Sequence, residues 1–155
     1  MPRVPRDQGP GYFHVTTRGN NGRDIFHTAA DRRVFLALLG RVGREREWVL
    51  QTWCLMTNHF HLVVETRHAN LSAGMQRLNG LYAQWFNAWH LRTGHLFGRR
   101  FWAKRIDTET QLQATADYVI HNPVRAGLCT DPWDWRWTGG ALFAEPDGPA
   151  DARLP

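Results

Sequence analysis

The sequence predicts an α+β fold in which helices cover one face of an antiparallel, ferredoxin-like sheet. β-rich segments and segments with helical spacing of apolar residues follow one another as strand, helix, strand, strand, helix, strand, helix. Two adjacent strands are separated by only a tight turn, which favours antiparallel pairing. With 155 residues, the chain suits one domain with a proper core. We expect that domain over residues 1–143, with a basic arm at 1–11 and a disordered tail at 144–155.

The first half of the chain is predicted to form three strands and one helix. β-branched and aromatic residues bounded by glycines predict a strand over 11–19, followed by a turn at 20–26. Thr28 can cap a helix that runs to about residue 46, because its apolar residues form one stripe at helical spacing. Segments 48–56 and 59–65 then predict a hairpin that turns at Thr57 and Asn58.

The second half predicts two helices and a basic strand. A helix over 71–89 is capped by Asn70, and 95–107 is expected to be a strand. A third helix follows from about Thr108 until Pro123 stops it, with Leu112, Ala116 and Val119 facing the sheet. The apolar stripe of the helix over 71–89 is assigned to the core and contains Met75, Leu78, Tyr82, Trp85 and Trp89.

Charge and composition narrow the class of partner. Nineteen Lys and Arg residues against fourteen Asp and Glu residues give a net charge of +5, which favours a polyanionic partner such as nucleic acid. Two cysteines without a metal-ligand spacing suit a reducing compartment. No apolar stretch approaches the roughly 18 residues that span a bilayer, so we expect a cytoplasmic protein without a membrane partner.

Two histidines stand one residue apart in the predicted strand over 59–65. Alternation places His59 and His61 on one face, while Phe60 and Leu62 point to the core. Two imidazoles can close onto one cation, although hydrogen-bonded strand histidines are the more common case. Tyr118 and its fourth neighbour along the predicted third helix, Asn122, share another face, with the same ambiguity.

These segments together resemble the single-tyrosine HUH transposases, in particular the REP-associated branch, where HUH means histidine, hydrophobic residue, histidine. The resemblance rests on four stretches: FHVTTRGNNGRDIF, WCLMTNHFHLVVE, GHLFGRRFWAKRID and DYVIHNPVRAGL. It extends to about Gly140. Thr57 stands where the family commonly has proline, and His121 stands where an apolar residue is common.

The resemblance implies a chemistry for the motif residues. Tyr118 would attack single-stranded DNA and form a 5′-phosphotyrosine, so that strands are cleaved and rejoined in DNA transposition. His59, His61 and Asn122 would hold Mg²⁺ or Mn²⁺. This HUH site would lie on the sheet next to the tyrosine helix. Either a monomer or a homodimer is compatible with the sequence.

Basic residues interleaved with aromatic ones are candidates for holding single-stranded or hairpin DNA. For any one of them, a solvated basic strand edge is the competing interpretation. The candidates are Arg3, Arg6, Arg18, Asn20, Arg99, Arg100, Lys104, Arg105 and Arg125.

Two other functions remain open from the sequence. The first is a domesticated, transposase-derived regulator that binds hairpin DNA without cleaving it. The second is a hydrolase whose two histidines hold Zn²⁺ and activate water, which would leave Tyr118 without a role.

Overall fold

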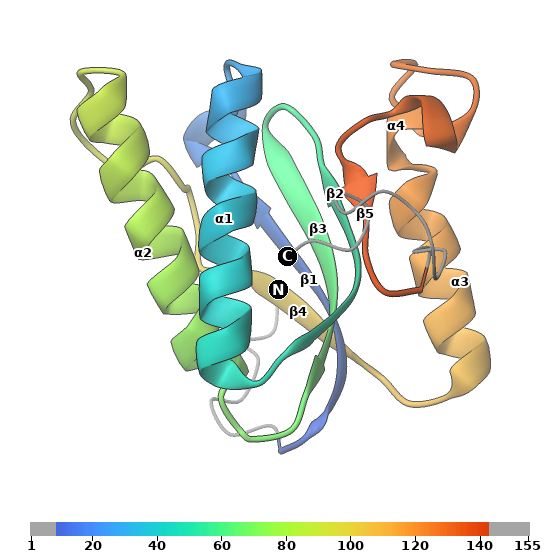
Figure 1. Cartoon of the computed structure of the whole chain (residues 1–155). Helices are drawn as coiled ribbons and strands as arrows, with labels where there is room; N and C mark the ends of the chain where they lie inside the picture. The colour runs from blue at the N-terminus through green and yellow to red at the C-terminus, as the bar shows by residue number, and fades with distance from the viewer. Residues whose placement is uncertain (1–8, 143–155) are drawn as a thin grey trace.

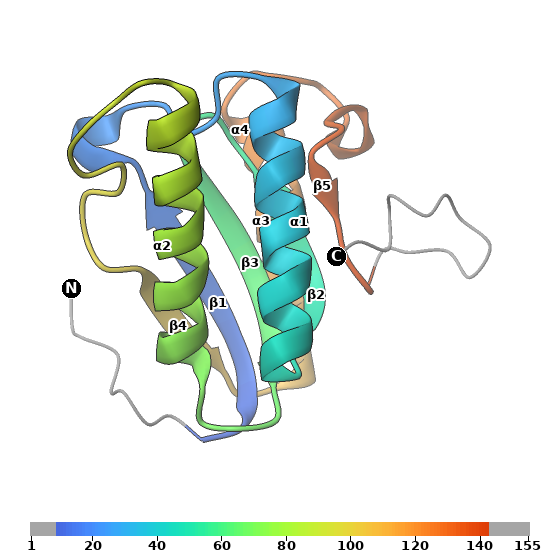
Figure 2. The same cartoon turned by 60° about the vertical axis from the view of Figure 1, so that its left-hand side comes forward.

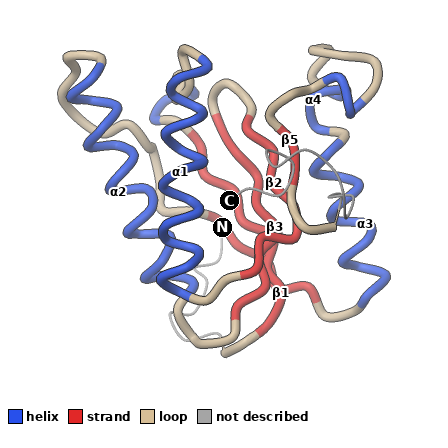
Figure 3. Tube along the Cα trace, viewed as in Figure 1, coloured by secondary structure: helices blue, strands red, loops and turns tan. Residues whose placement is uncertain are grey.

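The computed structural model of the protein describes residues 9–142 and is built on one five-stranded sheet. The strand order is β4-β1-β3-β2-β5, and every neighbouring pair is antiparallel. This arrangement confirms the predicted α+β fold with an antiparallel sheet (Figure 3). The strands are β1 (Gly11–Arg18), β2 (Val49–Leu55), β3 (His59–Thr66), β4 (Trp102–Ile106) and β5 (Thr138–Gly139).

Helices pack on both faces of the sheet. In Figures 1 and 2 the helices α1 and α2 lie side by side on one face, and α3 lies on the other. The expectation of helices on one face therefore holds for α1 and α2, whereas α3 covers part of the opposite face. The helices are α1 (Ala29–Arg46), α2 (Leu71–Trp89), α3 (Glu109–Ile120) and the short α4 (Asn122–Arg125).

The alternation of β3 divides the core in two. Phe60, Leu62 and Val64 are fully buried in the main core, together with the apolar faces of α1 and α2. Val63 points the other way, into a smaller cluster that contains Val119 of α3. This partition follows from the period of two along a strand, and it leaves His59 and His61 on the α3 side.

The two predicted helix caps differ in outcome. Thr28 forms a capping box with Asp31, because each side chain accepts a hydrogen bond from the other residue's backbone N–H. Asn70 occupies the N-cap position of α2 without capping it. Its amide instead accepts a hydrogen bond from the Trp48 indole and donates one to the Arg46 carbonyl. Asn70 therefore ties α2 to the chain that links α1 and β2.

The predicted basic strand over 95–107 is shorter than expected. Only Trp102–Ile106 forms β4, and residues 95–101 are a loop that touches β1 through an isolated bridge between Gly19 and Phe97. β1 ends at Arg18, so the loop has no continuous strand to pair with. Its apolar residues Leu96 and Phe101 are instead buried in the main core.

Other expectations are corrected or fall outside the described residues. Trp89 was assigned to the core but is 67% exposed, because it lies at the end of α2, where its ring stacks on Trp85. Pro123 does not end the helical path: α3 ends at Ile120, and Pro123 lies in the first turn of α4, where its missing N–H is tolerated. The tail at 144–155 and most of the basic arm, including Arg3 and Arg6, lie outside residues 9–142.

Within residues 9–142, no helix combines the length and the apolar character needed to cross a membrane.

Candidate active site

The two histidines of β3 lie under the edge of α3 rather than on an open surface. His59 is 9% exposed and His61 is 3% exposed. Their ring centroids are 5.0 Å apart and the ring planes are nearly perpendicular. In the sheet, His61 lies between Thr16 of β1 and Cys54 of β2. The pair is thus buried at the centre of the sheet face that α3 covers in part.

Hydrogen bonds orient both imidazoles. The Nδ1 atom of His59 lies 2.7 Å from the Asn58 side-chain oxygen, so it must carry the proton and donate. The Nε2 atom of His61 lies 3.0 Å from the amide nitrogen of Asn122, so it accepts and its proton sits on Nδ1. That Nδ1 atom is 3.0 Å from both the Thr16 hydroxyl and the His14 Nε2. Both Nε2 atoms of the HUH pair are therefore left unprotonated.

Burial keeps this cluster of imidazoles neutral. It lowers the pKa of His59 to about 4 and the pKa of His61 to about 2, and the positive charge of Arg18 adds to both shifts. Burial and then the charge of Lys104 lower the pKa of His14 to about 4. Neutral imidazole is the form that binds a metal ion. The site is therefore ready to bind a cation at neutral pH without first releasing protons.

Tyr118 stands beside these histidines on the exposed side. Its ring centroid lies 6.0 Å from those of His61 and His14, and the residue is 49% exposed. The helix α3 holds it there, because the buried residues Ala116, Val119 and Ile120 anchor the other side of the helix. The Arg125 guanidinium lies 4.1 Å from the Tyr118 ring centroid and donates to the Tyr118 carbonyl. The Arg125 side chain thus holds the Tyr118 phenol next to the histidine pair.

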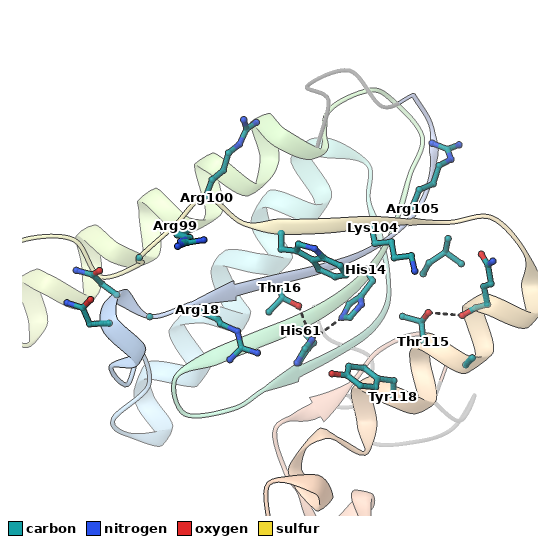
Figure 4. A pocket seen from close by; sticks show the side chains of 18 residues that line it. His14, Thr16, Arg18, His61, Arg99, Arg100, Lys104, Arg105, Thr115 and Tyr118 are labelled. Atoms are coloured by element: carbon teal, nitrogen blue, oxygen red, sulfur yellow. Dashed lines mark hydrogen bonds between the residues drawn. The ribbon is translucent and has the colours of Figure 1, made fainter. Parts of the chain in front are cut away.

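A cavity of about 930 Å³ opens in front of these side chains. Figure 4 shows His61, His14 and Thr16 at its floor, with Tyr118 projecting from α3. Trp102 of β4 packs edge-on against His14, at a centroid distance of 5.1 Å. The predicted residues that line the cavity are Arg18, Asn20, His61, Arg99, Arg100, Lys104, Arg105 and Tyr118. Among residues 9–142, no acidic side chain lines the cavity.

The other predicted residues, and the guanidinium of Arg105, take different positions around the cavity. Asn122 lies next to His61, and His59 completes the group through its ring contact with His61. Arg125 stacks on Tyr118 instead of lining the cavity. The Arg105 guanidinium donates to the Pro10 carbonyl and lies over Phe13, on the face of α1 and α2. Arg105 therefore contributes less directly to this site than Lys104 does.

Several site residues were missed by the sequence interpretation. His14 and Thr16 contact His61 directly, and Asn58 orients His59. The signal for the first two was present, since alternation along β1 places His14, Thr16 and Arg18 opposite the buried Phe13 and Val15. What the sequence did not give was the register that sets Thr16 opposite His61.

Comparison with known proteins agrees with this geometry. Residues 10–122 match the family model described as "Transposase IS200 like". This match spans the strands β1 to β4 and the Tyr118 helix, and it places the chain in a family of transposases. The chain belongs to the IS200-like transposase family, which associates it with DNA transposition. The predicted resemblance to the single-tyrosine HUH transposases is thereby confirmed.

Solved structures share the fold at low sequence identity. One is a REP-associated tyrosine transposase bound to a REP hairpin, with a TM-score of 0.72 and 18% identity over 96% of this chain and 98% of that chain. Another is a transposase-like protein from Deinococcus radiodurans R1, with a TM-score of 0.54 and 13% identity over 76% of this chain and 95% of that one. A search of the curated proteins found no match.

Proposed function

We propose that the protein cleaves and rejoins single-stranded DNA through a covalent intermediate on Tyr118, with a divalent cation held by His59, His61 and Asn122. One observation carries the proposal. The fold brings a half-exposed phenol, two neutral imidazoles and an amide together at the edge of a basic cavity. Residues from β3, α3 and α4 meet there, although they are far apart in the sequence.

The donor set fits a hard divalent cation. The Asn122 amide nitrogen lies 3.0 Å from His61 Nε2, and the ring centroids of His59 and His61 are 5.0 Å apart. Two ligands at right angles, each about 2.1 Å from one Mg²⁺, would be about 3 Å apart. Turning the amide would present its oxygen in place of its nitrogen. When bound, the cation would neutralise charge on a non-bridging phosphate oxygen and orient the phosphate.

Tyr118 would act as the nucleophile. Its phenolic oxygen would attack phosphorus and form the P–O bond, while the bond from phosphorus to the 3′ oxygen breaks. The phenol releases its proton to solvent, and the departing 3′ oxygen takes up a proton. Arg125, stacked on the ring, holds the phenol in place and offsets the negative charge that attack develops. Reversal by the 3′-OH of another strand would rejoin DNA without ATP.

The cavity supports binding of the strand itself. Arg18, Arg99 and Lys104 are among its lining residues, so they can contact the phosphates of a bound strand. Trp102 offers an aromatic face on which a base can stack. The structurally similar REP-associated transposase is bound to a REP hairpin, and we propose that this chain belongs to that branch and recognises a DNA hairpin of the same kind.

The decisive experiment is the Tyr118→Phe variant. Wild-type protein, incubated with Mn²⁺ and a single-stranded oligonucleotide that carries its recognition hairpin, is expected to form a denaturant-resistant adduct through a 5′-phosphate. Tyr118→Phe removes only the hydroxyl, so it should keep the fold and the DNA affinity but form no adduct. Tyr12→Phe is the matched control, because this partly buried tyrosine packs against the apolar cluster that contains Val63 and Val119, and it should form the adduct normally.

The same assay separates the alternatives. A metal-dependent hydrolase would cut DNA without a covalent intermediate and would tolerate Tyr118→Phe. A DNA-binding regulator would bind the hairpin and leave it uncut in both proteins. Cleavage by Tyr118→Phe at the wild-type rate would contradict the proposal.

A further inference from the structure

A second group of metal-ligating side chains lies where α1 begins and α2 ends. His27 precedes α1, Asp31 is in its first turn, and His90 directly follows α2. One ligand atom from each residue lies within 4.8 Å of the other two. Figures 1 and 2 show these two helix ends side by side, on the opposite side of the sheet from α3. The group is therefore separate from His59 and His61.

The carboxylate of Asp31 is fixed with one oxygen turned toward this group. It is fully buried. Its Oδ2 atom accepts the backbone N–H groups of His27, at 2.7 Å, and Thr28, at 3.1 Å. Its Oδ1 atom accepts from His90 Nε2 at 2.9 Å. Capping of α1 thus occupies the Oδ2 atom of Asp31, whereas its Oδ1 atom faces the two imidazoles and can act as a metal ligand.

Packing holds the two imidazoles near that oxygen. The ring centroids of His27 and His90 are 4.8 Å apart. Both rings contact Phe86, at centroid distances of 5.1 and 4.2 Å. His90 is mostly buried, whereas His27 is exposed. The His90 ring is therefore held by its surroundings, whereas the exposed His27 ring can turn toward Asp31. Solvent can reach the group from the side of His27.

We propose that His27, Asp31 and His90 form a site for a transition-metal cation of the Zn²⁺ type. Two imidazole nitrogens and one carboxylate oxygen suit Zn²⁺, whereas Mg²⁺ prefers an all-oxygen set. Water would fill the fourth position. On binding, His90 would lose the Nε2 proton to solvent and take one up on Nδ1, so that the neutral imidazole ligates through Nε2. The ligand atoms would contract to about 3.3 Å apart, the spacing of a tetrahedral site with bonds of about 2.0–2.1 Å.

Such an ion would act on the architecture around the DNA cavity and not on the reaction. It would clamp the start of α1 to the end of α2. The segment before α1 bonds to the β2–β3 turn, through the backbone N–H groups of Ile25 and Phe26 to the Thr57 carbonyl. The segment after α2 leads to the loop that carries Arg99 and Arg100. The site would thus tie together two connections that border the cavity.

The test isolates this site by removing the HUH pair. In a His59→Ala/His61→Ala background, titration calorimetry with Zn²⁺ should show one bound ion per chain. A Zn²⁺ concentration 100-fold above Kd should raise the Tm by about 5–10 °C. Co²⁺ should give the intense visible absorption of a tetrahedral site. Adding His27→Ala or His90→Ala should abolish all three signals.

His68→Ala in the same background is the matched control. His68 is an exposed histidine that pairs with Glu47, so it represents adventitious surface binding and its removal should change nothing. Metal-free melting curves report whether each variant is folded, and His27→Ala, at an exposed position, keeps the test interpretable if His90→Ala unfolds. Absence of Zn²⁺ binding in the double-alanine background would overturn the proposal. Unchanged binding in the folded His27→Ala variant would overturn it equally.

Discussion

Removing both hydrogen-bond partners of the His61 Nδ1 atom is expected to weaken metal binding far more than removing either partner alone. The Thr16 hydroxyl and the His14 Nε2 each lie 3.0 Å from that atom. Thr16→Val deletes the hydroxyl at nearly constant volume. His14→Phe deletes the ring nitrogen and keeps an aromatic ring against His61 and Trp102. The two substitutions therefore remove the hydrogen bonds with little loss of packing.

The structure sets the expected magnitude. Residues that orient a metal-bound histidine are each worth about 10–100-fold in metal affinity when their contact is the sole one. Here each partner can substitute for the other, because the single Nδ1 proton needs one acceptor. Each single variant should thus lose well under tenfold, and the double variant about 10–100-fold, or roughly 1.4–2.7 kcal/mol. The double-mutant cycle should be clearly non-additive.

Calorimetric titration with Mn²⁺ of the wild type, both single variants and the double variant measures this coupling without DNA. Thr17→Val is the matched control. Thr17 is the next residue of β1, is equally buried and bonds to Asn79 of α2 on the opposite face, so its loss should lower stability and leave Mn²⁺ affinity unchanged. Wild-type Mn²⁺ affinity in the double variant would refute the reasoning, and so would strictly additive losses.

Three further outcomes are expected. Phe60→Ala should lower the free energy of unfolding, measured by urea denaturation, by about 3–5 kcal/mol. His59→Ala or His61→Ala should instead leave a folded protein by the same measurement but abolish Mn²⁺-dependent cleavage in the adduct assay. The pKa values of the active-site histidines are lower in the folded protein than in the unfolded chain. As the pH falls, the unfolded chain therefore takes up protons before the folded protein does. Stability present above pH 6.5 should therefore fall toward pH 4, by about 2–3 kcal/mol per histidine at pH 4.5, and a urea midpoint independent of pH over this range would contradict it. Hairpin binding should exceed duplex binding and weaken steeply with salt, and Lys104→Ala should reduce the slope of log K against log salt by about one while Arg44→Ala, on the exposed side of α1, does not.

The sequence determined the features that depend on neighbours along the chain. Alternation along 59–65 was enough to place Phe60 and Leu62 in the core and the two histidines on the other face. The capping box at Thr28 was equally local, since both partners lie within one turn. The family resemblance also came from short stretches whose order and spacing agree with the matched residues 10–122. The first two features need only a few consecutive residues, and the third needs only the order and spacing of short stretches.

The tertiary structure decided what surrounds the site. A period of two says which face carries His61, but not that α3 covers this face or that Thr16 of β1 lies opposite. The same limit applies to residues 95–101, which form a loop that buries Leu96 and Phe101 in the main core despite their strand-like composition. It applies also to Trp89, which has the spacing of a core residue but lies exposed at the end of α2. Strand register and helix docking are set by contacts between distant segments, whose energies no local pattern contains.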